Sequence, residues 1–164
     1  MLTKVPFYFQ TTRKMVIAFG GLFNNIFCVT KDKQSTTQKI VQVPLAYANK
    51  EKWLVRLRQD PGLSEDVQIT LPRMSFEIVG YEYDAARQLN KMNRIVTEQN
   101  GRTVYSYAPV PYNITFQLYT YTRTQEDNLQ IMEQILPYFT PDMNLSIKVM
   151  QNPDVVQDCA LILE

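Results

Sequence analysis

Hydrophobic and polar residues alternate with a two-residue period over two long segments, Met74–Tyr83 and Tyr112–Thr122. Successive side chains of a β-strand point to opposite faces of the sheet. The residues that share one side are Met74, Phe76, Ile78 and Gly80 in the first segment and Ile114, Phe116, Leu118 and Thr120 in the second. The pattern therefore predicts two long strands, each with one buried face.

A helical period marks the segment Thr12–Asn25, where apolar residues recur at three- and four-residue spacing. The residues on this face are Met15, Phe19, Leu22 and Phe23. The pair Gly20-Gly21 lies within the stripe, and each glycine weakens a helix by roughly 1 kcal/mol relative to alanine. Two interpretations stay open here: a close approach of another segment to the helix backbone, or a kink or helix end.

Thr124 begins the clearest predicted helix, which runs to Phe139. Asp127 follows Thr124 by three residues, as in an approximate capping box, and Pro137 and Pro141 end the helix. We expect its apolar stripe to pack on the sheet that contains Tyr112–Thr122; the stripe is Leu129, Met132, Ile135, Leu136 and Phe139. A shorter helix is predicted over Lys50–Arg58, with Asn49 as its N-cap.

Shorter apolar runs predict further strands. They are Ile26–Thr30, Lys39–Tyr47, Asn144–Met150 and a run from Asp158 that stops within a strand-like pattern at Glu164. Pro44 cannot donate to a β-ladder, so it indicates an edge or a bulge.

Lys91–Glu98 and Arg102–Ala108 flank Asn100-Gly101, a strong hairpin signal, and the polar hairpin over residues 91–108 is expected to project. The predicted fold is a single α+β domain over residues 1–164. Its sheet is mixed and mainly antiparallel, with two or three helices packed on one face. Residues 1–11 are expected to form an extended arm.

Composition narrows the range of functions. The chain has 164 residues, a net charge of +1 and no histidine. The commonest general base and metal ligand is therefore missing, and no basic patch indicates nucleic-acid recognition. Cys28 and Cys159 are expected to be buried reduced thiols rather than a disulfide. No signal peptide or membrane span is predicted.

Candidate chemistry is sparse. The sequence has no phosphate-binding glycine loop and no G-x-S-x-G element. The acidic pairs Glu65-Asp66 and Glu126-Asp127 consist of adjacent residues whose side chains point apart. The second pair would also complement the dipole at a helix N-terminus. No catalytic residue, metal ligand or cofactor is predicted.

Tyrosines recur on the predicted strands, often two residues apart, as in Tyr81 with Tyr83 and Tyr119 with Tyr121. Tyrosine suits a half-exposed sheet face, and it is also enriched at the cores of protein interfaces. Both interpretations stay open. Stacking on nucleic-acid bases would need interleaved Lys and Arg, which Tyr112–Thr122 lacks.

Four groups of residues, in order along the chain, resemble the tail-completion or tail-sheath-stabiliser proteins of large contractile-tailed bacteriophages. They are Leu22-Phe23-x-Asn25-Ile26; Val43-Pro44-x-x-Tyr47-Ala48-x-Lys50-Glu51; Leu71-Pro72-Arg73; and Thr122-Arg123 with Glu126-Asp127 and Glu133-Gln134-Ile135-Leu136-Pro137-Tyr138-Phe139-x-Pro141. The last run is the most specific. Family members continue beyond the position of Glu164, so this chain is expected to be a shorter variant or an incomplete one.

The resemblance implies a non-catalytic virion protein, made in the host cytoplasm, that forms a six-fold ring at the head-proximal end of the tail. It also implies contacts with the tail terminator, the sheath and the neck or head-completion proteins. Two alternatives remain: another tail or neck part, such as the terminator or a baseplate adaptor, or an enzyme that acts through carboxylates or tyrosine.

Ring subunits need two different complementary surfaces. The arm and the hairpin tip at Asn100 and Gly101 are candidates to reach a neighbouring subunit. Arg73 and Arg123, which lie in the family-like segments, are candidates for polar interface contacts. For each arginine, an ion pair within its own subunit is the alternative.

Overall fold

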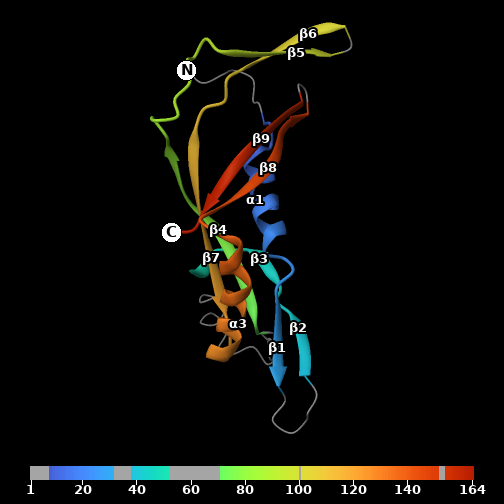
Figure 1. Cartoon of the computed structure of the whole chain (residues 1–164), viewed down its shortest axis with the longest axis vertical. Coiled ribbons are helices and arrows are strands. Elements are labelled where there is room, and N and C mark those ends of the chain that lie inside the picture. Colours follow the sequence, from blue (N-terminus) through green and yellow to red (C-terminus); the bar gives the residue numbers. More distant parts are fainter. Residues whose placement is uncertain (1–7, 32–37, 52–70, 100, 152–153) are drawn as a thin grey trace, which may run out of the picture. The chain divides into compact units, whose positions relative to one another are not determined.

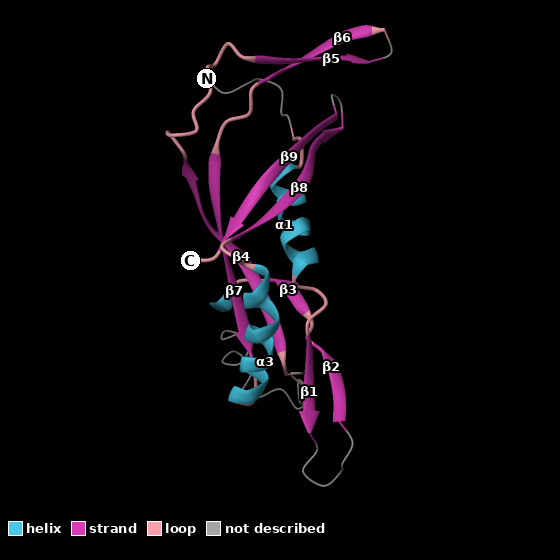
Figure 2. Ribbon diagram, viewed as in Figure 1, coloured by secondary structure: helices cyan, strands magenta, loops and turns pink. Residues whose placement is uncertain are grey.

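The computed structural model describes residues 8–31, 38–51, 71–99, 101–151 and 154–164. It confirms an α+β fold (Figures 1 and 2). The helical elements are α1 (Thr11–Leu22), α3 (Gln125–Ile135) and the 3₁₀ turn η1 (Leu136–Tyr138). The strands are β1 (Phe27–Lys31), β2 (Gln38–Gln42), β3 (Leu45–Tyr47), β4 (Arg73–Tyr83), β5 (Arg94–Gln99), β6 (Arg102–Tyr107), β7 (Tyr112–Tyr121), β8 (Asp142–Gln151) and β9 (Asp154–Ile162).

The described strands are distributed among four small sheets rather than gathered in one. Three are antiparallel pairs, β1 with β2, β5 with β6 and β8 with β9. The fourth has the order β3-β4-β7, and β3 runs parallel to β4. The pairing is therefore mixed and mainly antiparallel, as expected.

The chain forms two compact units. The helix–sheet unit comprises Phe19–Gly80 and Ile114–Thr140, and the hairpin unit comprises Met1–Ala18, Tyr81–Asn113 and Pro141–Glu164. Each unit is made of separate segments of the chain. The divisions between the two units fall within α1, within β4 and within β7, and also after Thr140. The single domain over residues 1–164 stays a prediction.

An aromatic cluster forms the centre of the helix–sheet unit. Phe19, in the last turns of α1, stacks on Phe116 of β7 with ring centroids 4.4 Å apart and an interplanar angle of 9°. Phe23 and Phe76 lie 4.9 Å and 5.1 Å from the Phe19 ring. Met74 and Phe76 are buried, which confirms the predicted apolar face of this strand.

The glycine pair in α1 has two different roles. A Cβ on Gly20 would lie 3.3 Å from Cζ of Phe76, whereas one on Gly21 would meet nothing within 4 Å. Gly20 therefore marks a close approach of β4 to the helix, and the helix ends one residue after Gly21, at Leu22. Each of the two open interpretations holds for one glycine.

The strand predicted over Lys39–Tyr47 is wrong as a single element. It is broken at Val43 and Pro44 into β2 and β3, which belong to different sheets. The Val43 N–H donates to Ile26 O at 2.8 Å, whereas Pro44 O accepts from the Met74 N–H at 2.9 Å. Because Pro44 has no N–H to continue the first ladder, the chain changes sheets at this point.

Thr124 caps α3 as predicted, since its side chain accepts a hydrogen bond from the Asp127 N–H. The predicted stripe, however, is confirmed at Ile135 and is wrong for Leu129, Met132 and Leu136. Ile131 and Ile135 are buried, whereas Leu129 and Leu136 are 54% and 45% exposed. The helix also ends earlier than Phe139, because Pro137 lies in the 3₁₀ turn η1.

Two glutamines explain the orientation of α3. The side-chain amide of Gln134 exchanges hydrogen bonds with both backbone groups of Phe27, at 2.7 and 3.2 Å. Gln130 does the same with Val29, at 2.8 and 3.2 Å. A four-residue step on a helix matches a two-residue step on a strand, so the pair covers this edge of β1. Ile131 and Ile135 then face the core, and Leu129 does not.

The hairpin unit contains the two hairpins β5–β6 and β8–β9. The Asn100-Gly101 hairpin is confirmed: β5 and β6 pair from Arg94↔Tyr107 to Gln99↔Arg102, and Gly101 has a φ of +70°. The last strand begins earlier than expected, at Asp154, and it pairs with β8 along its length.

Several sequence predictions fall outside the described residues. They concern residues 1–7 of the arm, Asn100 of the hairpin tip and most of the helix over Lys50–Arg58. At the start of that helix, Asn49 Oδ1 accepts from the Glu51 N–H at 2.8 Å, as an N-cap does.

Candidate interaction surfaces

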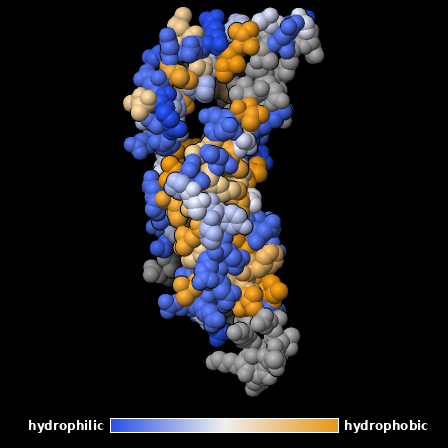
Figure 3. Space-filling model, viewed as in Figure 1, coloured by the Kyte–Doolittle hydropathy of each residue, from blue (hydrophilic) through white to orange (hydrophobic). Residues whose placement is uncertain are grey.

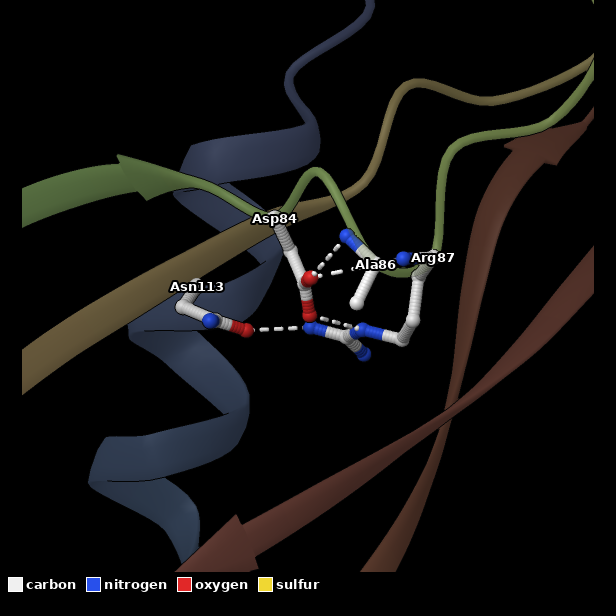
Figure 4. Close-up of polar contacts among 4 residues, drawn as sticks. All are labelled: Asp84, Ala86, Arg87 and Asn113. Carbon is white, nitrogen blue, oxygen red and sulfur yellow. Dashed lines mark hydrogen bonds and ion pairs between the residues drawn. The ribbon is translucent and has the colours of Figure 1, made fainter.

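The turn that follows β4 is held by a polar cluster, shown in Figure 4. Asp84 Oδ1 accepts from the backbone N–H groups of Ala86 and Arg87, and Asp84 Oδ2 lies 2.5 Å from Nε of Arg87. Arg87 also donates to the side-chain oxygen of Asn113. The hydrogen bond from Arg87 is the main cause that lowers the pKa of Asp84. The cluster joins the exit from β4 to the start of β7.

The two tyrosine pairs have different surroundings. Tyr81 and Tyr83 are exposed near the C-terminal end of β4. The Tyr83 ring meets the Tyr112 ring edge-on, with ring centroids 5.7 Å apart. Tyr119 and Tyr121 are half-buried. Tyr119 Oη donates to Glu77 Oε1 at 2.8 Å. Tyr119 therefore has a polar contact inside the subunit, whereas the rings of Tyr81 and Tyr83 remain largely accessible to solvent.

Glu77 raises the pKa of Tyr119 to about 12, chiefly because its carboxylate accepts a hydrogen bond from the protonated phenol. An unfolded tyrosine titrates near about 10. The contact therefore contributes stability that is fully present below about pH 10 and is lost as pH rises towards 12.

Replacement of Tyr119 by Phe should remove the last-titrating tyrosine from an absorbance titration of the folded chain at high pH. Glu77→Gln is the matched control: it keeps the phenol but removes the carboxylate, so the pKa of Tyr119 should fall. If the tyrosine that is lost from the titration curve of Tyr119→Phe has an ordinary pKa near about 10, the contact between Tyr119 and Glu77 is contradicted.

One face of the β5–β6 hairpin combines a cation with aromatic and aliphatic side chains. The guanidinium of Arg94 lies 5.3 Å from the ring centroids of both Tyr105 and Tyr107. The register places Val96 directly opposite Tyr105 on the same face. Val96, Tyr105 and Tyr107 are 64%, 59% and 61% exposed. We call Arg94, Val96, Tyr105 and Tyr107 the hairpin face.

Sequence reasoning selected the hairpin tip and missed this face. The signal was present, because Arg94 and Val96, like Tyr105 and Tyr107, are spaced by two residues. It became readable only with the register, which brings the two pairs to the same side. Tyrosine and arginine are the residue types enriched at binding hot spots.

A second exposed apolar surface lies on α3 and on Leu136, the first residue of η1. Leu129, Met132 and Leu136 are exposed, and Glu126 and Glu133 share their side of the helix. We call these five residues the α3 outer face. Figure 3 shows apolar side chains exposed among polar ones on the side of the molecule that it presents.

The remaining predicted interface residues are placed as follows. Arg73 is half-buried at the start of β4 and has interactions of its own, while Arg123 is exposed between β7 and α3. Gly101 is exposed at the hairpin tip. An interface role for the arginines, the tyrosines and the tip stays a prediction.

Neither cysteine is in a disulfide. Cys28 is buried and its thiol donates to Asp127 O at 3.7 Å. Burial, and then the charge of Asp127, raise the pKa of the Cys28 thiol. Cys159 is half-buried, and burial raises its pKa as well. A thiol with a raised pKa is a poor nucleophile and a poor metal ligand.

No three His, Cys, Asp or Glu side chains gather as metal ligands would in the described part of the chain. A shallow depression of the hairpin unit is lined by Tyr83, Gln88, Leu89, Asn90, Lys91, Ala108, Pro109, Val110 and Pro111. None of these side chains is a carboxylate, so this depression lacks the acid–base pair of a hydrolytic site. Within the same ranges, no helix is long and apolar enough to cross a membrane.

Comparison with known proteins identifies the class. Residues 6–164 match the model of the T4-like virus Myoviridae tail sheath stabiliser family, and the chain belongs to that family. It is 33% identical, over 147 residues, to the tail completion protein gp15 of Enterobacteria phage T4. The match covers 86% of this chain and 53% of that relative, so the chain spans about half the length of the relative.

The chain is thus a structural component of a contractile phage tail, and the resemblance noted in the sequence is confirmed. The matched region contains Val43-Pro44, where the chain changes sheets, and Gln134 and Ile135, which orient α3. The family-like segments therefore coincide with residues that build the helix–sheet unit.

Proposed function

We propose that this protein forms a closed six-fold ring at the head-proximal end of the tail and has no catalytic activity. The observation that carries the proposal is the composition of the hairpin unit. Its one buried hydrophobic side chain among the described residues is Ile147. Exposed apolar side chains of the same unit include Ile17, Tyr81, Leu89, Met92, Val96, Tyr105, Tyr107, Val110, Tyr112 and Val156.

The described part of this unit therefore has few buried apolar side chains and many that face water. Monomeric soluble proteins rarely expose large contiguous apolar surfaces, and those that do use them for association. Burial in an assembly contributes about 25 cal/mol per Å² of apolar surface. Assembly with other subunits would therefore supply the core that the hairpin unit lacks.

The partners follow from the class of protein. A tail sheath stabiliser acts on the sheath, and a tail completion protein finishes the tail. We infer that the ring contacts the sheath and the tail terminator on one side and the neck or head-completion proteins on the other. The near-neutral net charge of +1 suits contacts with proteins rather than with exposed phosphates. The subunits would be made and assembled in the host cytoplasm.

Within this proposal, Arg73, Arg123, Tyr81 and Tyr83 are candidates for contacts with other proteins. Charge reversal at Arg123, which is exposed, should reduce the joining of heads to tails without loss of fold.

Deletion of the hairpin tip, Glu98–Arg102, should impair ring formation. If tails lacking the tip are completed normally, the tip is only a solvated loop.

The mass of the purified chain in solution tests the ring directly. Light scattering or native mass spectrometry should detect a species of six copies, alone or with its tail partners present. Each neighbour contact should bury at least about 1,000 Å² in total. A chain that stays monomeric under both conditions would contradict the ring.

A further inference from the structure

One edge of the β1–β2 hairpin is occupied by a helix instead of a strand. Backbone groups of an antiparallel strand point alternately towards the partner strand and away from it. Ile26 O accepts from the Val43 N–H at 2.8 Å, so the backbone groups of Ile26, and those of Cys28 two residues later, point towards β2. The N–H and C=O groups of Phe27 and Val29 therefore point away from β2, to the side on which α3 lies (Figure 1).

Gln130 and Gln134 satisfy these four outward-facing backbone groups. Each side chain ends in an amide, which offers a donor and an acceptor as a peptide group does. Gln130 accepts from the Val29 N–H at 2.8 Å and donates to Val29 O at 3.2 Å. Gln134 accepts from the Phe27 N–H at 3.2 Å and donates to Phe27 O at 2.7 Å. The two side chains thus present to β1 the hydrogen-bonding groups of a neighbouring strand.

The spacing of the two amides matches that of the strand. Residues four apart in a helix are separated by about 6.0 Å along its axis, and alternate residues of an antiparallel strand by about 6.8 Å. One amide therefore lies opposite each outward-facing residue of β1. The helix is also held from its other side, because Ile131 and Ile135 are buried in the core. A further strand can pair with this edge only if the two amides leave it.

From this geometry we propose that Gln130 and Gln134 form an edge guard, which prevents β1 from pairing with β1 of a second copy of the chain. Unprotected strand edges are templates for pairing with another chain. The β1 edge suits such pairing, because Phe27 and Val29 favour strands and the segment contains no proline. Donors and acceptors alternate along the edge, so two copies of it complement each other when they run antiparallel.

An antiparallel β1–β1 pair would join two hairpins in one four-stranded sheet. Such a contact is isologous, because the same surface is used on both copies, whereas a ring needs two dissimilar surfaces. The edge guard would therefore remove a contact that competes with ring closure. The inference itself does not depend on the proposed ring, because the edge is covered within a single chain.

Replacement of both glutamines by alanine opens the edge and keeps the helix, since alanine is the best helix former. Native mass spectrometry of Gln130→Ala/Gln134→Ala should detect a species with twice the mass of the wild-type species. The concentration at which half of the chains are in that species should be lower than in the wild type by about tenfold or more. Gln125→Ala is the matched control at an exposed position of the same helix, and it should leave the mass unchanged.

Hydrogen exchange at low concentration, before the double-mass species forms, locates the change. In the double variant, the amides of Phe27 and Val29 should exchange faster than in the wild type by about tenfold or more. The Cys28 amide, which points towards β2, is the internal reference and should keep its rate. Equal acceleration at all three amides would mean that β1 as a whole unfolds, and it would overturn the edge guard.

A proline separates edge pairing from a general loss of stability. Val29→Pro, added to the double variant, removes the outward N–H, and proline is tolerated on an edge strand at such a position. The double-mass species should then disappear. The proposal is wrong if the double variant keeps the wild-type mass at every concentration, or if the proline leaves the double-mass species in place.

Discussion

Replacement of Ile131 by Ala should lower the free energy of unfolding by about 2–5 kcal/mol. Ile131 is fully buried on the side of α3 that faces the core, and large-to-small changes at such sites cost the lost burial and leave a cavity. Urea unfolding followed by circular dichroism measures the effect. We expect the slope of the transition to stay unchanged, because the change affects packing rather than the extent of unfolding.

Leu129→Ala is the matched control, two residues away on the same helix. Leu129 is largely exposed, and leucine and alanine are both good helix formers, so the unassembled chain should lose no more than about 0.5 kcal/mol. Equal losses at both positions would mean that α3 packs in a different orientation from the one that Gln130 and Gln134 define.

Phe19→Ala should be the most destabilising single change in the helix–sheet unit, with a loss of about 3–5 kcal/mol. The Phe19 ring lies within 5.1 Å, centroid to centroid, of the rings of Phe23, Phe76 and Phe116. Its removal deletes three aromatic contacts at once. The same urea measurement applies.

Ile17→Ala provides the comparison, because Ile17 lies two residues earlier in α1 and is 63% exposed. Its loss should stay within about 0.5 kcal/mol. A small loss for Phe19→Ala would show that the aromatic cluster does not hold α1 on β4 and β7.

The strands and the helix start could be predicted because their signals are local. Alternation of apolar residues located β4 and β7, Asn100-Gly101 located the hairpin, and Thr124 located the start of α3. Each signal lies within a few residues of the feature that it predicts.

The orientation of α3 could not be predicted in the same way. The stripe assigned to the core, Leu129, Met132, Ile135, Leu136 and Phe139, has a helical spacing, and so does the set of Ile131 and Ile135. The choice between the two sets is made by hydrogen bonds from Gln130 and Gln134 to β1, about a hundred residues earlier in the chain. The leucines that were assigned to the core are exposed on the α3 outer face.

The break at Val43 and Pro44 escaped prediction for a similar reason. Pro44 indicated an edge or a bulge, but a change of sheet depends on where the partners Ile26 and Met74 lie. The hairpin face likewise depends on the register between β5 and β6. Local patterns specify elements, whereas faces and interfaces require pairing between distant segments.

The position of this chain in the finished particle tests the central claim most directly. A tagged, functional copy can be located on intact virions by electron cryomicroscopy. Density for the tag should lie only at the head-proximal end of the tail, in a ring of six copies between the last sheath disc and the neck. Tag density along the sheath, at the baseplate or nowhere on completed tails would contradict the proposed function.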